Sequence, residues 1–185
     1  MKEGKITRKV SLEGVRPLLL DRYAGDNKTE LLPEQKMYLD GKNGLIMPSM
    51  NIHSFLCATN TKSAVKMFYD PRKYKNVAAA ILGFVTIEPF EIQLCRKGKQ
   101  IKWEGWDKNG ITLRKDVARL EKGIPNPKER PQIASPWELD FELTLWENGE
   151  ITEQEVKNLF VKGGIPIGLG TYRGVFGKFI VKEWK

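Results

Sequence analysis

The stretch from Gly164 to Val181 has residue types that could bind a charged or flat ligand through the main chain. It reads "GIPIGLGTYRGVFGKFIV", and its five glycines surround Tyr172 and Arg173. Glycine adopts positive φ and lets backbone amides approach another group closely. Turn geometry alone explains one or two of these glycines. Two interpretations therefore stay open, a tight connection or a surface that contacts a ligand or a neighbouring subunit.

Basic and aromatic side chains are interleaved through the middle of the chain. Cations neutralise phosphates and flat rings stack on bases, so this mixture suits single-stranded nucleic acid. A solvated surface with aromatic stems packed on the core is the alternative. The residues predicted to bind nucleic acid are Arg72, Lys73, Lys75, Arg96, Lys97, Lys99, Lys102, Trp103, Trp106, Arg114, Arg119, Gly168, Gly170, Tyr172, Arg173 and Gly174.

Few residues have the pattern of a catalytic or cofactor site. His53 is the single histidine, and it lies beside Ser54 in an expected helix, where adjacent side chains point in different directions. The glycine-rich stretch lacks the lysine and hydroxyl residue of a P-loop and follows a helix instead of a strand. We therefore expect no metal, no cofactor and no catalytic residues.

Asp21 and Asp26 are the carboxylates that leave an enzymatic alternative open. They lie close to Arg22 and Lys28 after the first expected strand, where an acid could assist phosphodiester cleavage. A metal-dependent endoribonuclease that uses Asp21 or Asp26 is thus an alternative function. Capping of the loop's own amides is the favoured role.

The overall composition indicates one soluble globular domain over residues 1–185. The 31 Lys and Arg residues against 23 Asp and Glu give a net charge of +8, which favours polyanionic partners such as nucleic acid or an anionic membrane surface. Cys57 and Cys95 lie too far apart to indicate a disulfide framework or a zinc ribbon. With neither a signal peptide nor a membrane span in the sequence, we expect a cytoplasmic protein.

Hydrophobic periodicity predicts the elements of the first half. Apolar and polar residues alternate from Ile6, and the first strand is expected to continue past Gly14, followed by a loop at about 22–35. Helices are expected to begin at Ser49, which could cap the first turn, and at Asp70.

The second of these helices is expected to end at Gly83. The strand that follows contains Pro89, which indicates an edge or a bulge. Strict alternation over 137–146 predicts a half-buried strand, and a capping box of Thr152 and Glu155 predicts a helix before the glycine-rich stretch. A last strand, "VFGKFIVKEW", completes the chain.

The resulting order is strand, helix, strand, strand, helix, strand. This βαββαβ order is typical of an α+β fold of the ferredoxin-like or RRM-like kind, with two helices on one side of a sheet. Residues 95–136 interrupt it with poor periodicity and high charge. We expect them to form a basic, thumb-like insertion arm, an extended hairpin with "GIPNPKE" near its tip.

The chain also resembles a known superfamily. Its terminal "GIPIGLGTYRGVFGKFIV", preceded by a capped helix and an acidic alternating strand, is similar to the glycine-rich signature of the RAMP superfamily, the ferredoxin-like backbone proteins of CRISPR effectors. With "LEGVRPLLLDRY" and "ERPQIASPWELDFELTL", it also resembles a small phage and prophage family of RAMP-like proteins. The resemblance implies binding of RNA or single-stranded DNA, like subunits side by side along the strand, and a thumb at the 95–136 arm.

These observations together predict a non-catalytic protein that binds single-stranded nucleic acid, with RNA favoured over DNA. The expected partners are the nucleic acid and like subunits in a homo-oligomer or a related assembly, without a membrane. A phage structural or assembly protein, which would form ordered oligomers without polynucleotide, is a further alternative.

Overall fold

The computed structural model describes residues 4–185 except 27, 120–122 and 124, and omits the side chains of residues 118 and 119. The elements in chain order are β1 (Lys5–Gly14), β2 (Leu18–Leu19), the 3-10 helix η1 (Pro33–Lys36), β3 (Ile46–Pro48), α1 (Ser49–Cys57), α2 (Ala64–Phe68), α3 (Tyr74–Phe84), β4 (Val85–Glu88), β5 (Glu91–Arg96), β6 (Lys99–Gln100), β7 (Ile111–Arg119), β8 (Pro125–Ile133), β9 (Glu138–Trp146), α4 (Glu153–Gly163) and β10 (Phe179–Trp184).

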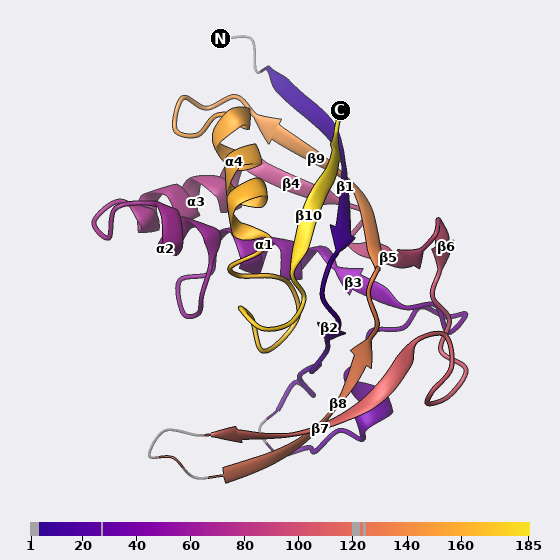
Figure 1. Ribbon diagram of the computed structural model, residues 1–185. Coiled ribbons are helices and arrows are strands. Elements are labelled where there is room, and N and C mark those ends of the chain that lie inside the picture. The colour runs from indigo at the N-terminus through magenta and orange to yellow at the C-terminus, as the bar shows by residue number, and fades with distance from the viewer. Residues whose placement is uncertain (1–3, 27, 120–122, 124) are drawn as a thin grey trace.

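The main sheet has the strand order of a ferredoxin-like fold. Its path is β10-β1-β9-β5-β3, and β4 also pairs with β9. β4 pairs with one end of β9 and β5 with the other, both antiparallel, so the two form one strand interrupted at Pro89. Helices α1–α3 connect β1 to this strand, and α4 connects β9 to β10. The predicted α+β class and βαββαβ order are confirmed (Figure 1).

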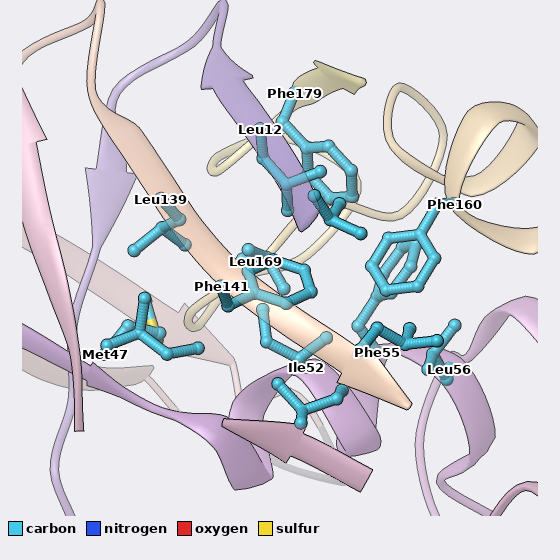
Figure 2. Close-up of a cluster of buried hydrophobic side chains, with 14 of the residues drawn as sticks. Leu12, Met47, Ile52, Phe55, Leu56, Leu139, Phe141, Phe160, Leu169 and Phe179 are labelled. Carbon is cyan, nitrogen blue, oxygen red and sulfur yellow. The ribbon is translucent and has the colours of Figure 1, made fainter. Parts of the chain in front are cut away.

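The hydrophobic core lies between the helices and one face of this sheet. The alternating residues of β9 from Leu139 to Leu145 are buried, as the sequence pattern predicts. Phe55 of α1 lies at the centre, with ring centroids 5.6 Å from Phe160 and 5.1 Å from Phe179 (Figure 2). Such aromatic contacts add roughly 0.5–1.5 kcal/mol each to the burial of apolar area. They fix α4 and β10, the two elements that flank the glycine-rich stretch.

The insertion between β5 and β9 contains the expected extended hairpin. β7 and β8 pair antiparallel from Ile111 opposite Ile133 to Arg119 opposite Pro125. β2 pairs with β8, so the hairpin joins the body through a second, three-stranded sheet. It projects away from the helices at the bottom of Figure 1, and we call it the arm, residues 111–133. Residues 120–122 and 124 of its tip lie outside the described ranges.

Several predicted boundaries differ from the structure. Ser49 is the first residue of α1 and not its cap, since its amide donates to the Phe90 carbonyl, 2.8 Å away. α3 begins at Tyr74, because Asp70 organises the preceding turn through its carbonyl and carboxylate. The first strand ends at Gly14, where a Cβ would lie 2.0 Å from the Trp137 ring. α2 was not predicted, because its five residues are too few for a periodic pattern.

Within the described ranges, no helix combines the length and apolar character needed to cross a bilayer.

Candidate nucleic-acid interface

The glycine-rich loop, residues 164–178, folds back on the body. The Leu169 amide donates to the Gly177 carbonyl at 2.9 Å, and the Gly177 amide donates to the Pro17 carbonyl at 2.8 Å. The Thr171 amide donates to the Leu19 carbonyl at 2.9 Å, and Leu169 itself is buried in the core (Figure 2). The loop is therefore anchored to the segment from Pro17 through β2 and to itself.

These contacts account for most of the predicted glycines of the loop. A Cβ at Gly177 would lie 2.0 Å from the Leu169 carbonyl oxygen, and one at Gly170 would lie 2.4 Å from that of Leu19. Gly168 is buried against Phe176 and Gly177, so it presents no surface to a ligand. Gly174 has room for a side chain, but its φ of +89° favours glycine. The stretch had two interpretations, a tight connection or a ligand-contacting surface. The tight connection explains Gly168, Gly170 and Gly177.

Arg173 points inward from this loop and does not extend into solvent as the prediction requires. Its Nη1 donates to the carbonyl oxygens of Ser54 at 3.2 Å and Lys62 at 2.9 Å, and its Nη2 donates to the Ser54 hydroxyl at 2.8 Å. None of the ion pairs between described residues involves Arg173. Burial lowers the pKa of its guanidinium because the charge is partly desolvated. Arg173 therefore holds the loop against α1 and leaves a positive charge there without a carboxylate partner.

Tyr172 is an exposed aromatic side chain of the loop, and its ring is positioned by Phe176. Tyr172 is 55% exposed and has a φ of +55°, which is rare for a bulky residue. Its ring stacks on that of Phe176, with centroids 5.8 Å apart and planes 29° apart. Arg114 lies on β7 of the arm. Its guanidinium lies over the Phe176 ring, 4.8 Å from the ring centroid. The three side chains form a row that joins the loop to the arm.

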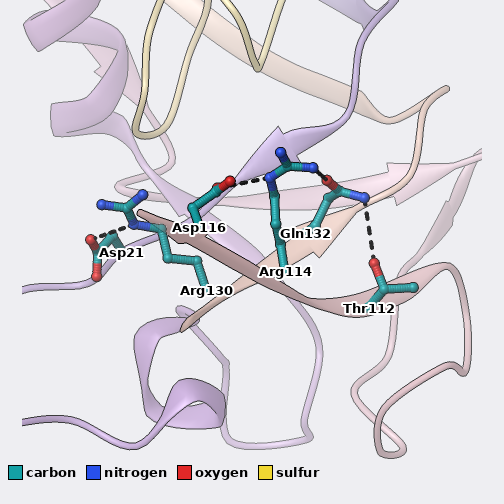
Figure 3. Close-up of polar contacts among 6 residues, drawn as sticks. All are labelled: Asp21, Thr112, Arg114, Asp116, Arg130 and Gln132. Atoms are coloured by element: carbon teal, nitrogen blue, oxygen red, sulfur yellow. Dashed lines mark hydrogen bonds and ion pairs between the residues drawn. The ribbon is translucent and has the colours of Figure 1, made fainter. Parts of the chain in front are cut away.

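The cations of the arm are largely held by polar partners. Arg114 Nε donates to Asp116 at 2.7 Å, and its Nη1 contacts Gln132 at 3.5 Å (Figure 3). Arg130 is buried and donates to the Asp21 carboxylate at 2.8 Å. The predicted site residue Arg119 ends β7, and its side chain lies outside the described atoms.

Asp21 and Asp26 both make structural contacts. Asp21 accepts from Arg130 and lies 3.9 Å from Lys36, so it fixes the segment after β2 to the arm. Asp26 accepts from the amides of Lys28 and Thr29, and the Thr29 hydroxyl bond contributes most to lowering its pKa. Asp26 thus caps its own loop, the role that the sequence favoured. In the described part of the chain, no group of three or more His, Cys, Asp or Glu side chains could hold a metal.

A second group of predicted residues surrounds a surface hollow of about 450 Å³ at the turn between β5 and β6. Arg96, Lys97, Lys99 and Lys102 line it. The guanidinium of Arg96 donates to the carbonyls of Pro136, Asn109 and Ala134 and thereby closes the base of the arm.

The two predicted stacking residues lie just beyond this hollow in the chain. The rings of Trp103 and Trp106 pack edge to face, with centroids 4.8 Å apart, and both are partly buried against the core. Neither ring therefore forms an open stacking platform, and the interpretation of aromatic stems on the core holds for both.

Arg72, Lys73 and Lys75 are exposed at the start of α3, away from the other cations. In Figure 1, α3 lies among the helices, whereas β6 lies on the opposite side of the view. The predicted cations therefore do not form one surface. They divide into the start of α3, the β5–β6 turn, and the junction of the loop with the arm.

The face of the main sheet that the helices leave open is acidic. On β9, Glu138, Asp140 and Glu142 alternate with the buried residues and so point to this face. Neighbouring strands add the carboxylates of Glu13, Glu88 and Glu183. Lys182 pairs with Glu13 and Lys185 with Glu183, and Lys9 lies opposite Glu142. Glu88, Asp140 and Glu142 take part in no ion pair between described residues. Many ferredoxin-like RNA-binding domains use this face to stack bases. Here the carboxylates would repel a phosphate backbone.

Two residues of the candidate interface were missed at the sequence level. Lys62 lies in the connection between α1 and α2, and its ammonium approaches Gly174 of the loop. Phe176 forms the centre of the row between Tyr172 and Arg114. No local sequence pattern marked Lys62, because it comes close to the loop only in the folded chain. The alternation of the last strand would have found Phe176 only as an apolar residue.

Comparisons with known proteins bear on the fold. No protein-family model matches the chain, and no curated protein matches it in sequence. In three dimensions it is similar to a chain of the cryo-EM structure of the Type III-B Cmr-beta bound to cognate target RNA, with a TM-score of 0.58 and 13% sequence identity. The similarity covers 98% of this chain and 60% of that one, so this chain spans less than two thirds of its neighbour. At this identity the likeness shows a shared fold.

Proposed function

We propose that this protein binds single-stranded RNA, without cleaving it, along the surface where the glycine-rich loop meets the arm. We define this loop–arm surface by Lys62, Arg114 and Tyr172, together with the buried Phe176 ring that contacts Arg114 and Tyr172. The observation that carries the proposal is the row of Arg114, Phe176 and Tyr172, which places two rings and a cation in contact at the foot of a projecting hairpin. Rings that stack on bases and cations that neutralise phosphates are what an unpaired strand requires.

The distribution of charge supports this path for the strand. The chain carries a net charge of +8, yet the open face of the main sheet carries the carboxylates of Glu88, Asp140 and Glu142. A polyanion is therefore repelled from that face and attracted elsewhere. The loop–arm surface lies at the junction of the body with the second sheet, where Arg114 of the projecting arm contacts Phe176 of the loop.

The fold shared with a chain from an RNA-bound Cmr-beta structure favours RNA over DNA. From the sequence resemblance to the RAMP backbone proteins, we propose that like subunits assemble side by side along the strand. Membership of the small phage and prophage family stays a prediction from the sequence motifs. The endoribonuclease alternative is not favoured, since Asp21 is held by Arg130 and Asp26 caps its own loop.

Equilibrium binding of a labelled single-stranded RNA over a range of salt concentrations tests this function. We expect the logarithm of the association constant to fall linearly with that of the salt concentration, and duplex RNA of the same sequence to bind more weakly. Arg114→Gln should weaken binding, whereas Glu142→Lys on the open face should not. Assembly along the strand predicts complexes whose mass increases with RNA length. Absence of binding, or binding indifferent to salt, would overturn the proposal.

A further inference from the structure

A surface hollow of about 440 Å³ lies beside the tip of the glycine-rich loop. It is lined by Thr61, Lys62, Gly170, Thr171, Tyr172 and Arg173, and so combines the α1–α2 connection with the loop. Its size lies within the range of small-ligand sites in proteins. The hydrogen bonds from Arg173 to Ser54 and Lys62 hold its two walls together.

Two cations at this hollow have no carboxylate partner. Neither Lys62 nor Arg173 takes part in an ion pair between described residues. The pKa of Arg173 is lowered because its guanidinium is partly desolvated without a compensating anion. Arg173 is partly buried and donates to carbonyl and hydroxyl oxygens, which leave its positive charge unneutralised, and Lys62 is exposed beside it. An anionic group in the hollow would supply the missing negative charge.

The third component is the ring of Tyr172. A positive φ costs a residue with a side chain about 1–2 kcal/mol, so a bulky aromatic is an unfavourable choice at this position. Strained residues of this kind are often found at functional sites. Stacking on Phe176 holds the ring in place while more than half of Tyr172 stays exposed. The ring is therefore positioned before any ligand binds.

We propose that this hollow is a single-nucleotide subsite, in which Lys62 binds the phosphate beside the positive charge of Arg173 and the base stacks on Tyr172. The inference rests on the proposed binding of single-stranded RNA and assigns one nucleotide of that strand to named atoms. Stacking is tolerant of sequence because every base has a π-face, so the subsite would select unpaired bases without distinguishing among them.

The test compares a short oligouridylate with a ribose-phosphate oligomer of the same length that lacks bases, both measured by fluorescence anisotropy. Tyr172→Leu should weaken oligouridylate binding at least roughly fivefold, while Tyr172→Phe retains it. Neither substitution should change binding of the abasic oligomer. Lys62→Gln should make the salt dependence for both oligomers less steep by about 0.7 in the log–log slope, as the loss of one phosphate contact predicts.

Controls separate the subsite from the fold and from the general function. Phe90→Leu removes an exposed ring from the connection between β4 and β5, and Lys9→Gln removes an exposed cation from the open sheet face. Neither residue lines the hollow, and both variants should bind as the parent protein does. Tyr172→Gly removes the ring at a φ that glycine tolerates, so a weak binder with an unchanged melting temperature supports the subsite.

The outcomes that contradict the inference are distinct. If the parent protein binds oligouridylate and the variants at Tyr172 and Lys62 match the controls, the proposed function stands and the subsite is wrong. If Tyr172→Leu weakens both oligomers equally, stacking on a base is wrong. If the parent protein binds neither oligomer, the proposed function itself fails.

Discussion

The guanidinium of Arg114 lies 4.8 Å from the centroid of the Phe176 ring, and this contact joins the arm to the glycine-rich loop. The two residues come from different parts of the fold, because Arg114 lies on β7 of the second sheet and Phe176 lies in the loop before β10. With Tyr172 stacked on the same ring, the position of the arm is coupled to that of the exposed aromatic. The candidate interface therefore depends on how rigidly this contact is held.

A double-mutant cycle measures that coupling. Arg114→Met keeps the apolar stem and removes the charge, and Phe176→Leu removes the ring. We expect the free energies of unfolding, measured in urea, to show a coupling of about 0.5–1 kcal/mol, typical of a partly exposed cation–π pair. If the two single effects add within about 0.3 kcal/mol, the contact does not join the arm to the loop.

The close approach at Gly177 predicts a large effect of a single methyl group. Gly177→Ala places a Cβ 2.0 Å from the Leu169 carbonyl oxygen, and Gly149→Ala meets nothing within 4 Å at a similar positive φ. Both substitutions carry the backbone cost of about 1–2 kcal/mol. Thermal unfolding should show that Gly177→Ala is the more destabilised by several kcal/mol. Equal melting temperatures would contradict the role of Gly177 in the packing of the loop.

Asp21 is expected to act in stability and not in catalysis. Asp21→Ala removes the partner of the buried Arg130, and it should lower the free energy of unfolding by about 2–3 kcal/mol. Asp26→Ala, in an exposed loop, should have a smaller effect. Incubation of the parent protein with RNA and Mg²⁺ should give no product bands. Cleavage that Asp21→Ala abolishes without a loss of stability would favour the endoribonuclease instead.

The hydrogen bonds that Asp40 accepts predict that the stability of the fold depends on pH. The Asp40 carboxylate accepts from the Gln100 side chain and from the amides of Gly44 and Lys42, which lowers its pKa from 3.8 to about 2. Because the folded-state pKa is depressed, this contribution is present above about pH 4 and is lost as the pH falls toward 2. Asp40→Asn should therefore be less stable than the parent protein near neutral pH and should match it near pH 2. A constant difference across this range would contradict the assignment.

Local patterns in the sequence were sufficient for the central elements of the fold. The alternation in "WELDFELTLW" places Leu139 and Phe141 in the core, and the capping box of Thr152 with Glu155 is present, with the Thr152 amide donating to Glu155 at 2.8 Å. These features depend on residues a few positions apart. The order of strands and helices could therefore be predicted from the sequence.

The candidate site depends on contacts that no local pattern contains. Arg173 turns inward because Ser54 and Lys62, more than a hundred residues earlier, supply its acceptors. Gly170 is needed because Leu19 passes beside it. The basic residues looked continuous along the chain, yet folding separates those at α3 from those at the β5–β6 turn. The net charge of a sequence therefore does not tell where on the folded surface the cations gather.

Photo-crosslinking with a single-stranded RNA that contains 4-thiouridine, followed by mass spectrometry of the linked peptides, tests the central claim most directly. We expect links within residues 164–178, at Lys62 and on β7, and none on the outward residues of β4 and β9. Links concentrated on Glu88 and its neighbours of the open sheet, or an even spread over the molecule, would contradict the loop–arm surface as the path of the RNA.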